Sequence, residues 1–361
     1  MKNKNRIISF VLIGILLILL FAVSGCGTAE KADSSNTSDA NSKTRVVTDM
    51  SGRKVTIPKE VNKVISLSNN TTVDIYTLAP DKLLGLSFKM KDTAKDYIPE
   101  KYFNLPTVGT TSDGKVDNEA ILKLSPDLIV CSNEDGVFPA DDIQKQLKIP
   151  VVMVTTDMDK TDKVYTFLGD CLNEKARGKE LADYSKKTLD KVKSLVAKVP
   201  KDKKVSVYYA EMTGLQTDIS GNVHTEVLDF AGGKNVADIT EAKVGSMAQV
   251  SMEQVLNWNP QVILVGVAKT DLYSTLLSDE KWAKVQAVHD KKVYKTPAIP
   301  FNWFDRPPSA VRVLGAEWLA NLLYPDYVKI DIKSETKNYY EEFFGIKLTN
   351  TQLNDILKNA Q

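Results

Sequence analysis

The stretch FNWFDRPPSAVR, residues 301–312, combines aromatic side chains, two arginines and two adjacent prolines. Arg306 presents a planar fork of donors that suits an oxyanion or a carboxylate. Arg312 lies one helical turn further along and could face the same way. Trp303 could stack against a flat or chelated ligand. The alternative is that the aromatic side chains pack into the interior of the protein. The guanidinium of Arg306 would then pair with the neighbouring aspartate.

The two prolines place the start of a helix in this stretch, because proline cannot continue a helix from upstream but suits a first turn. We expect the helix to run from about Pro308 to Leu323, with Asp305 or Ser309 as its cap. A helix start offers free N–H donors and a partial positive charge, which would strengthen an anion site at Arg306.

Other candidate ligand residues follow predicted strands elsewhere in the chain. The loops SLSNNTT (66–72) and VGTTSDG (108–114) are rich in small polar side chains, which could bind a ligand or cap the next helix. The segment YYAEMTG (208–214) ends a further strand, and a carboxylate there would disfavour an anion and suit a cationic complex. The candidates from these loops are Asn69, Asn70, Thr71, Thr110, Thr111, Tyr209 and Glu211.

The residue types and motifs present give little support for a metal-binding or an enzymatic function. The chain has two histidines, whereas a cage for a free transition-metal ion commonly uses two or three together with a carboxylate. His224 precedes a predicted helix and is a cap or a cleft residue, while His289 is expected at the surface. No GxSxG, Walker loop, HExxH or GxGxxG occurs. We therefore expect no enzyme activity, no bound metal ion and no cofactor. A surface protein that binds another macromolecule is a further alternative, which an exposed apolar face would favour.

The helices and strands that position the candidate ligand residues are predicted to occur in two similar sets. VDNEAILKLSPDLIV (116–130) returns as VSMEQVLNWNPQVIL (250–264), and each copy predicts a short helix, a break at proline and a buried strand. Strands and amphipathic helices alternate on both sides of these phrases. The repeat predicts an α/β fold with two lobes, and a ligand site is expected between them, beyond the carboxyl ends of the strands.

A single long helix is predicted between the two halves. The segment 173–199 keeps apolar residues at helical spacing over roughly 25 residues, or about 38 Å. Such a rod is stiff, so we expect the lobes to close on a ligand by only a few ångströms. The predicted domains are an amino-terminal lobe at 45–158, a connecting helical segment at 159–200 and a carboxyl-terminal lobe at 201–361.

The first residues of the chain have the layout of an export signal. Within residues 1–25, three basic side chains precede an apolar run and then small residues. The run VSGC resembles the bacterial lipobox, in which Cys26 is lipidated and becomes the first residue of the mature chain. An uncleaved membrane anchor is the alternative. Residues 27–44 contain no large apolar side chain, so we expect a flexible tether over 26–44.

Charge and cysteine content bear on whether the chain binds nucleic acid and whether it forms a disulfide. Removal of the signal takes three of the 47 Lys+Arg and none of the 46 Asp+Glu, which leaves 44 against 46 and a net charge of −2. A nucleic-acid-binding protein normally shows a basic excess, so we expect no nucleic-acid partner. Cys131 ends an apolar strand and Cys171 lies in a helical pattern. Both are most simply buried thiols, with a disulfide between them as the alternative.

Taken in order, the motifs resemble a known family. TDMSGRKVTIP, VISLS, VGTTSDGKVDNEAILKLSPDLIV, DISGNVHTEVLDFAGGKNVA, QVSMEQVLNWNPQVILV and NWFDRPPSAVRVLGAEWLANLLYP are similar to segments of the solute-binding lipoproteins of ABC importers, closest to the iron-complex and cobalamin type. The resemblance runs from about Arg45 to Gly345. It implies two Rossmann-like lobes joined by one helix, and a monomer that is lipid-anchored on the outer face of the cytoplasmic membrane.

The resemblance also implies how the protein meets its transporter. In that family each lobe presents a carboxylate to a permease subunit, and the matching residues are Glu119 and Glu253 of the repeated phrase. Both open a predicted helix, where a carboxylate could instead serve only as a cap. The implied ligand is a ferric siderophore, haem or a corrinoid. Arg306 at a helix start fits a small oxyanion such as molybdate or tungstate equally well.

Overall fold

The computed structural model describes residues 42–110, 114–133, 139–239 and 247–361. Residues Lys43–Gln361 form one unit. The predicted signal, the predicted lipidation site Cys26 and the candidate Thr111 lie outside the described residues. Among the helices that the structure describes, each is too short or too polar to cross a lipid bilayer.

The amino-terminal lobe contains a parallel sheet whose strands are ordered β4-β3-β5-β6. Residues of its two central strands are fully buried, because helices cover such a sheet on both faces. A β-hairpin of two antiparallel strands precedes the sheet, with Thr48 paired to Lys54 across the turn. The strands are β1 (Thr44–Thr48), β2 (Lys54–Pro58), β3 (Val64–Ser66), β4 (Leu83–Gly85), β5 (Leu128–Ser132) and β6 (Val151–Val154).

The carboxyl-terminal lobe contains a second parallel sheet, ordered β9-β7-β11-β12. Numbered along the chain within each lobe, both sheets have the order 2-1-3-4. A short antiparallel ribbon of β8 and β10 lies beside the second sheet. The strands are β7 (Ser206–Ala210), β8 (Gln216–Thr217), β9 (Lys234–Asn235), β10 (Ala248–Gln249), β11 (Val262–Val265) and β12 (Val293–Lys295).

The repeated phrase occupies the same place in the two sheets, which confirms the two-lobed α/β fold. One copy forms α3 (Asn118–Leu124) and β5, and the other forms α8 (Met252–Trp258) and β11. Each helix ends at a residue with positive φ, Ser125 or Asn259, which turns the chain into the following proline. β5 and β11 are the third strands of their lobes, so the similarity of sequence reflects one unit built twice.

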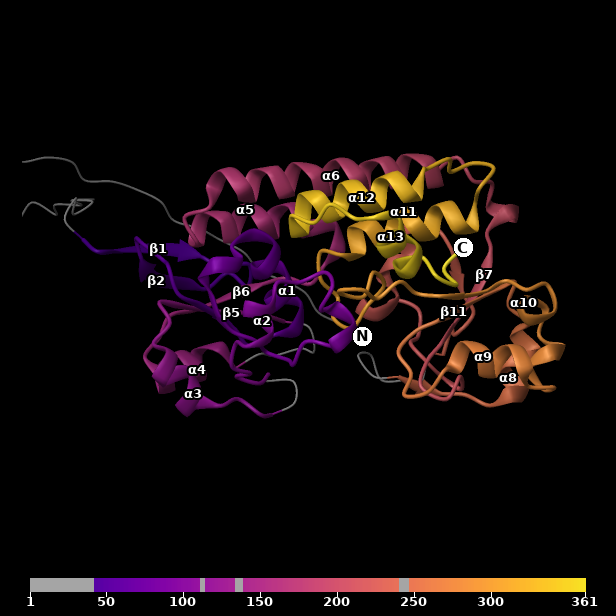
Figure 1. Ribbon diagram of the computed structural model, residues 1–361, viewed down its shortest axis with the longest axis horizontal. Helices are drawn as coiled ribbons and strands as arrows, with labels where there is room; N and C mark the ends of the chain where they lie inside the picture. The colour runs from indigo at the N-terminus through magenta and orange to yellow at the C-terminus, as the bar shows by residue number, and fades with distance from the viewer. Residues whose placement is uncertain (1–41, 111–113, 134–138, 240–246) are drawn as a thin grey trace, which may run out of the picture. The chain divides into compact units, whose positions relative to one another are not determined.

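The long helix predicted between the halves is α6, Lys175–Val196, and it bridges the two lobes. It packs against α5 (Thr161–Cys171) and α11 (Arg312–Leu323), and α12 (Ile332–Phe344) packs on α11, so these helices lie side by side above the sheets (Figure 1). Gly178 permits the close crossing of α5 and α6, since a Cβ there would lie 2.6 Å from a backbone oxygen of α5.

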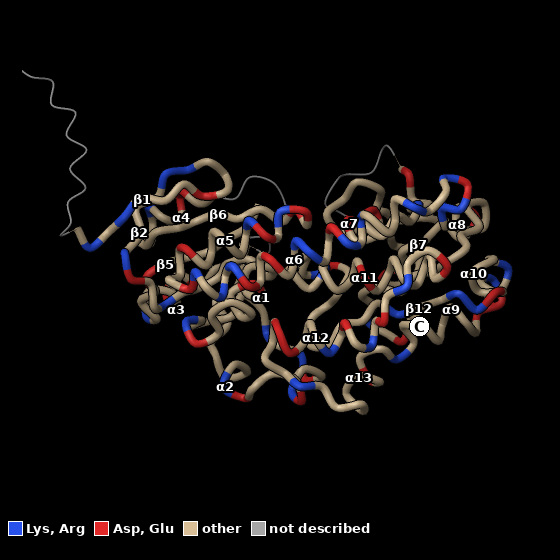
Figure 2. Tube along the Cα trace, turned by 90° about the horizontal axis from the view of Figure 1, so that it is seen from above, with Lys and Arg blue, Asp and Glu red and all other residues tan. Residues whose placement is uncertain are grey.

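The remaining α-helices are short, apart from the one that follows β3. Figure 2 shows acidic and basic residues interspersed along the Cα trace of both lobes. The remaining α-helices are α1 (Asn69–Leu78), α2 (Glu100–Phe103), α4 (Ala140–Leu147), α7 (Glu226–Phe230), α9 (Leu272–Ser278), α10 (Gln286–His289) and α13 (Asn350–Ile356).

Two details of the sequence interpretation are resolved by the packing. Cys131 and Cys171 are free, buried thiols, as expected. The helix predicted from Pro308 starts only at Arg312, and neither of the side chains predicted to cap it does so. The reason is that residues 309–312 form a tighter turn, in which the N–H of Arg312 donates to the carbonyl of Ser309 at 3.1 Å.

Candidate ligand site between the lobes

Each sheet has one point where the chain connections leave in opposite directions, and ligands of such folds bind beyond the carboxyl ends of the strands there. In the first lobe this point lies between β3 and β5. Ser132, at the end of β5, donates its hydroxyl to Oδ1 of Asn70 at 2.7 Å, so both polar groups lie at that edge. In the second lobe it lies between β7 and β11, where Glu211 follows β7.

A small polar cavity of about 10 Å³ lies where loops of the first lobe meet the turn that leads into α11. A volume of this size holds roughly one water molecule. Most of its lining residues have polar side chains, and they come from segments distant in sequence. The lining residues are Asn70, Asp74, Thr155, Thr156, Asp157, Thr161, Val164, Pro308, Ser309, Ala310 and Arg312.

Arg312 ties together the segments around this cavity. Its Nη1 lies 2.7 Å from Oε2 of Glu226, and its Nη2 donates to the carbonyl oxygen of Thr156. The other carboxylate oxygen of Glu226 accepts from the backbone N–H of Met158 at 3.0 Å. The guanidinium therefore has one ion-pair partner and otherwise donates to carbonyl oxygens, while the carboxyl groups of Asp74 and Asp157 also line the cavity.

Asp74 and Ser309 bring further polar groups to the cavity. Oδ1 of Asp74 accepts from the backbone N–H of Ala310 at 3.0 Å, a contact between α1 and the turn before α11. Burial raises the pKa of the Asp74 carboxyl to about 7, although Ala310 and Arg312 oppose the shift. The hydroxyl oxygen of Ser309 is buried and has no hydrogen-bond partner among the described residues. It is therefore available to a ligand.

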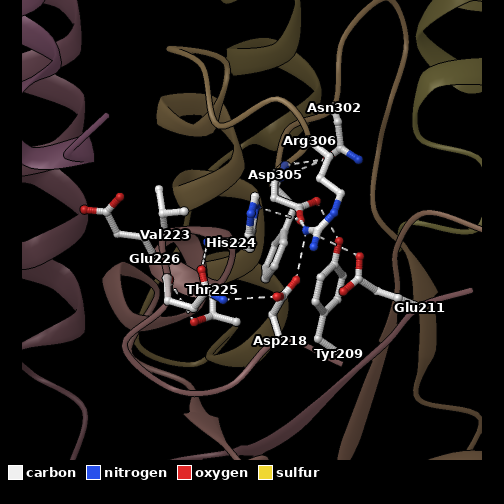
Figure 3. Close-up of polar contacts among 12 residues, drawn as sticks. Tyr209, Glu211, Asp218, Val223, His224, Thr225, Glu226, Asn302, Asp305 and Arg306 are labelled. Atoms are coloured by element: carbon white, nitrogen blue, oxygen red, sulfur yellow. Dashed lines mark hydrogen bonds and ion pairs between the residues drawn. The ribbon is translucent and has the colours of Figure 1, made fainter. Parts of the chain in front are cut away.

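A second polar cluster surrounds Arg306 (Figure 3). Nη1 of Arg306 contacts Oδ2 of Asp305 and lies 2.8 Å from Oδ2 of Asp218 and 3.6 Å from Oε1 of Glu211. These three carboxyl groups are fully buried, whereas the arginine side chain is 23% exposed. Arg306 also has a φ of +36°, which is unfavourable for a residue with a long side chain. The carboxylates hold it in place.

Neighbouring donors orient the carboxylates of this cluster. The hydroxyl of Tyr209 donates to Oδ1 of Asp305 at 2.7 Å, and Nδ2 of Asn222 donates to Oδ1 of Asp218 at 3.1 Å. Burial, reinforced by the charge of Asp305, raises the pKa of Glu211 well above its ordinary value. Burial also lowers the pKa of His224 to about 4, helped by the nearby positive charge of Arg306. At neutral pH the imidazole is therefore uncharged.

The structure thus brings several of the predicted ligand residues together in two groups. Tyr209, Glu211, His224 and Arg306 meet in the second cluster, while Asn70 and Arg312 line the cavity. The pairing of Arg306 with Asp305, weighed as the alternative for this stretch, is present. A ligand-binding role for these residues stays a prediction.

Trp303 is completely buried, and its Nε1 donates to the hydroxyl of Tyr340 at 3.4 Å. Its carbonyl oxygen packs against Gly315 of α11, where a Cβ would lie only 1.8 Å away. The side chain therefore fills the interior at this corner.

The remaining loop candidates contact the protein itself. Oδ1 of Asn69 accepts from the hydroxyl of Ser87 at 2.9 Å, and the hydroxyl of Thr71 donates to the carbonyl of Ser68 at 3.1 Å. Thr110 is buried, and its carbonyl accepts from the N–H of Lys115 at 3.1 Å. None of the three lines the cavity, so their roles as ligand residues also stay predictions.

Glu119 and Glu253 are both exposed, in the first turns of α3 and α8. Capping does not explain them, because the side chains of Asp117 and Ser251 accept from the N–H groups at these helix starts. Neither glutamate has a hydrogen bond or an ion pair with any residue in the described ranges. Their carboxylates are therefore free to meet another molecule.

Sequence reasoning missed Asp74, Asp218 and Glu226, and it considered Asp305 only as a cap or as the partner of Arg306. One signal was available for Asp74, because a carboxylate in the otherwise apolar run TTVDIYTL is expected to be buried with a partner. Asp218 and Glu226 carry no such signal, since they approach the two arginines only through the tertiary fold.

Comparisons with known proteins identify the family to which this chain belongs. The family model described as "Periplasmic binding protein" matches residues 64–300. The chain belongs to this family. Its members are binding proteins of transporters rather than enzymes, so the chain is an ABC solute-binding protein that binds a small ligand.

The chain is similar to three named relatives. It is 30% identical to the molybdate-binding protein MolA of Haemophilus influenzae, over 83% of this chain and 91% of that one. It is 27% identical to the ABC transporter substrate-binding lipoprotein YvrC of Bacillus subtilis, over 87% and 96%. It is also 28% identical to the haem uptake protein IsdE of Staphylococcus aureus, over 64% and 79%.

Solved structures agree with this placement. An ABC transporter solute-binding protein from Sulfurospirillum deleyianum superposes with a TM-score of 0.80 at 31% identity, covering 87% of this chain and 99% of that one. MolA of Haemophilus influenzae bound to molybdate superposes with a TM-score of 0.69 at 27% identity, covering 84% and 99%.

Proposed function

We propose that this protein captures a small tetrahedral oxyanion, such as molybdate or tungstate, between its lobes and delivers it to an ABC permease. The observation that carries the proposal is the small polar cavity beside Arg312. The similarity to a molybdate-binding relative supports the same reading. These findings favour the oxyanion alternative over the iron complex, haem or corrinoid that the family resemblance first suggested.

Size and lining separate the two ligand classes. A siderophore or a corrinoid needs an open, aromatic-lined site, whereas the cavity beside Arg312 is about 10 Å³ and is lined mainly by residues with polar side chains. Trp303 and Phe304, the aromatic residues beside Arg306 in the sequence, are fully buried in the core. A larger hollow of about 840 Å³ lies at the amino ends of β7 and β9, the edge of the sheet opposite to the usual ligand site.

The groups around the cavity can balance the charge of an anion. Arg312 supplies positive charge, the hydroxyl of Ser309 is an unused donor, and the start of α11 adds its dipole. Oδ1 of Asn70 accepts from Ser132, which leaves the amide N–H groups as its remaining donors. Asp74, with a pKa of about 7, is protonated in part at neutral pH and can then donate. A modest separation of the lobes would admit the anion.

Calorimetry of the full-length chain tests this assignment. We expect binding of molybdate and tungstate, and none of a ferric siderophore, haem or cobalamin. Asn70→Asp should weaken oxyanion binding at least tenfold, because it adds a negative charge where a donor is needed. Asn338→Asp, which adds the same charge at an exposed position of α12, should leave the affinity unchanged. Binding of an iron chelate or a corrinoid, with no oxyanion bound, would contradict the proposal.

Delivery to the permease is proposed to use Glu119 and Glu253. The support is their exposure, their lack of partners among the described residues, and their equivalent positions in the two lobes. Replacing both by lysine should abolish oxyanion uptake by cells while calorimetric affinity stays unchanged. The matched control is the double replacement of the exposed Glu60 and Glu280 by lysine, one in each lobe. Normal uptake in the first variant would exclude this docking mode.

Retention at the membrane is proposed to depend on a lipid on Cys26. The support is the VSGC run and the similarity to a named lipoprotein. Cys26→Ser should abolish labelling by a radioactive fatty acid and release the mature protein from the membrane fraction. Unchanged labelling of that variant would exclude Cys26 as the attachment point.

A further inference from the structure

The cluster around Arg306 contains an arrangement that the proposed oxyanion site does not use. One ligand atom each from Asp218, His224 and Asp305 lies within 4.8 Å of the other two, and all three residues are buried. Nδ1 of His224 is already 3.5 Å from Oδ2 of Asp305. In a tetrahedral metal site with bonds of about 2.1 Å the ligand atoms lie about 3.4 Å apart. The three atoms would therefore need to approach one another by up to about 1.4 Å.

Several atoms of this cluster lack the hydrogen bonds that buried polar groups normally have. Nδ1 of His224 and Oε2 of Glu211 have no hydrogen-bond partner among the described residues, while Oδ2 of Asp218 and Oε1 of Glu211 lie 2.8 Å and 3.6 Å from Nη1 of Arg306. Glu211 is completely buried and points toward the same centre (Figure 3). Unsatisfied groups of this kind are costly in a folded protein unless a bound species meets them.

The other oxygens of the two aspartates are held in place. Oδ1 of Asp305 accepts from Tyr209, and Oδ1 of Asp218 accepts from Asn222, so each carboxylate turns its Oδ2 toward the shared centre. Metal ligands are commonly oriented in this way by donors behind them. The arrangement therefore has both the inward ligand atoms and the outer contacts that fix their direction.

We propose that Asp218, His224 and Asp305 form a binding site for one divalent transition-metal ion, with Glu211 as an additional carboxylate beside it. One imidazole nitrogen with carboxylate oxygens, and no thiolate, suits Zn²⁺ and neighbouring ions such as Co²⁺ and Ni²⁺. Mg²⁺ fits poorly, because it prefers oxygen ligands and retains several waters, whereas this cluster offers an imidazole nitrogen. The site is separate from the oxyanion cavity and does not depend on the proposed function.

Arg306 is the competitor for this site. Its Nη1 lies among the same oxygens and partly neutralises them. Two aspartates carry two negative charges, which a divalent ion matches and a single guanidinium does not. The arginine side chain is 23% exposed, so it can leave toward solvent when the ion enters.

The test uses the full-length chain without an affinity tag, freed of metal by a chelator and titrated with Zn²⁺ in a calorimeter and with Co²⁺ by visible absorption. We expect one ion per chain and the intense Co²⁺ band of a four-coordinate site, undiminished by excess Mg²⁺. His224→Gln should weaken binding at least tenfold. The chain has two histidines, and His289→Gln is the matched control, since that side chain is 81% exposed and should be irrelevant.

Two further variants keep the test decisive if His224→Gln folds poorly. Asp218→Asn preserves the contact with Asn222 and should also weaken Zn²⁺ binding at least tenfold. Arg306→Gln removes the competing cation and should strengthen it at least tenfold. General damage to the fold would weaken binding in every variant, so opposite effects identify the site. Absence of stoichiometric Zn²⁺ binding, or equal affinities in His224→Gln and His289→Gln, would overturn the proposal.

Discussion

Arg306 and Arg312 lie six residues apart, yet their surroundings differ in charge. The guanidinium of Arg306 contacts three fully buried carboxyl groups. That of Arg312 contacts the single carboxylate of Glu226, which is 24% exposed, and otherwise donates to carbonyl oxygens. The first guanidinium therefore faces three carboxyl groups, whereas the second has one ion-pair partner and lies beside a small cavity that Asp74 and Asp157 also line.

This difference shows that an arginine at a helix start does not by itself make an anion site. The number of carboxylates within a few ångströms decides the sign of the local field, because charges interact strongly where water is excluded. Around Arg306 three carboxyl groups face one guanidinium, whereas Arg312 has one ion-pair partner. This comparison supports the proposal of opposite ligands at the two arginines.

The largest expected effect is on stability, in Arg306→Gln. Removing the guanidinium leaves three buried carboxyl groups without a counter-charge, and loss of one partner of a buried ion pair typically costs about 3–5 kcal/mol. Urea unfolding at pH 7 measures the loss. The deficit should shrink at pH 5, where protonation removes the unpaired charge, and Zn²⁺ should restore part of it. A loss below about 1 kcal/mol at pH 7 would show that the cluster carries little charge.

Arg312→Gln should cost less, about 2–3 kcal/mol, because its single carboxylate partner is partly exposed and its other partners are neutral. Urea unfolding at pH 7 compares the stabilities of the two variants directly. Oxyanion binding should also fall at least tenfold in Arg312→Gln, since the positive charge beside the cavity is lost. If Arg306→Gln instead proved the weaker binder of molybdate, the assignment of the two ligands would be reversed.

The smallest effect concerns pH and Asp74. Its pKa of about 7 in the folded state lies above the unfolded value of 3.8, so the folded protein keeps a proton that the unfolded chain releases. This group therefore lowers stability as pH rises from about 4 through 7, by about 2 kcal/mol between pH 5 and pH 8. Asp74→Asn, which can still accept from Ala310, should remove that dependence. An unchanged pH profile of the unfolding free energy would mean that Asp74 is ionised throughout.

Much of the fold was predictable because it follows from local patterns in the sequence. The repeat of 116–130 at 250–264 indicated two lobes, and the structure confirms that both copies become the third strand of equivalent sheets. The spacing of apolar residues in 173–199 indicated the connecting helix, observed as α6. Helix starts were harder, because the turn at 309–312 depends on packing rather than on composition.

The sequence by itself determined the two α/β lobes, the helix that joins them and the residues that end the strands. Hydrophobic periodicity and proline positions are short-range properties, so they can be read without coordinates. Only the tertiary structure decided that Asp218 and Glu211 approach Arg306, while Glu226 and Thr156 approach Arg312. The charge of a site is the sum over groups brought together from distant parts of the chain, and no local pattern records that sum.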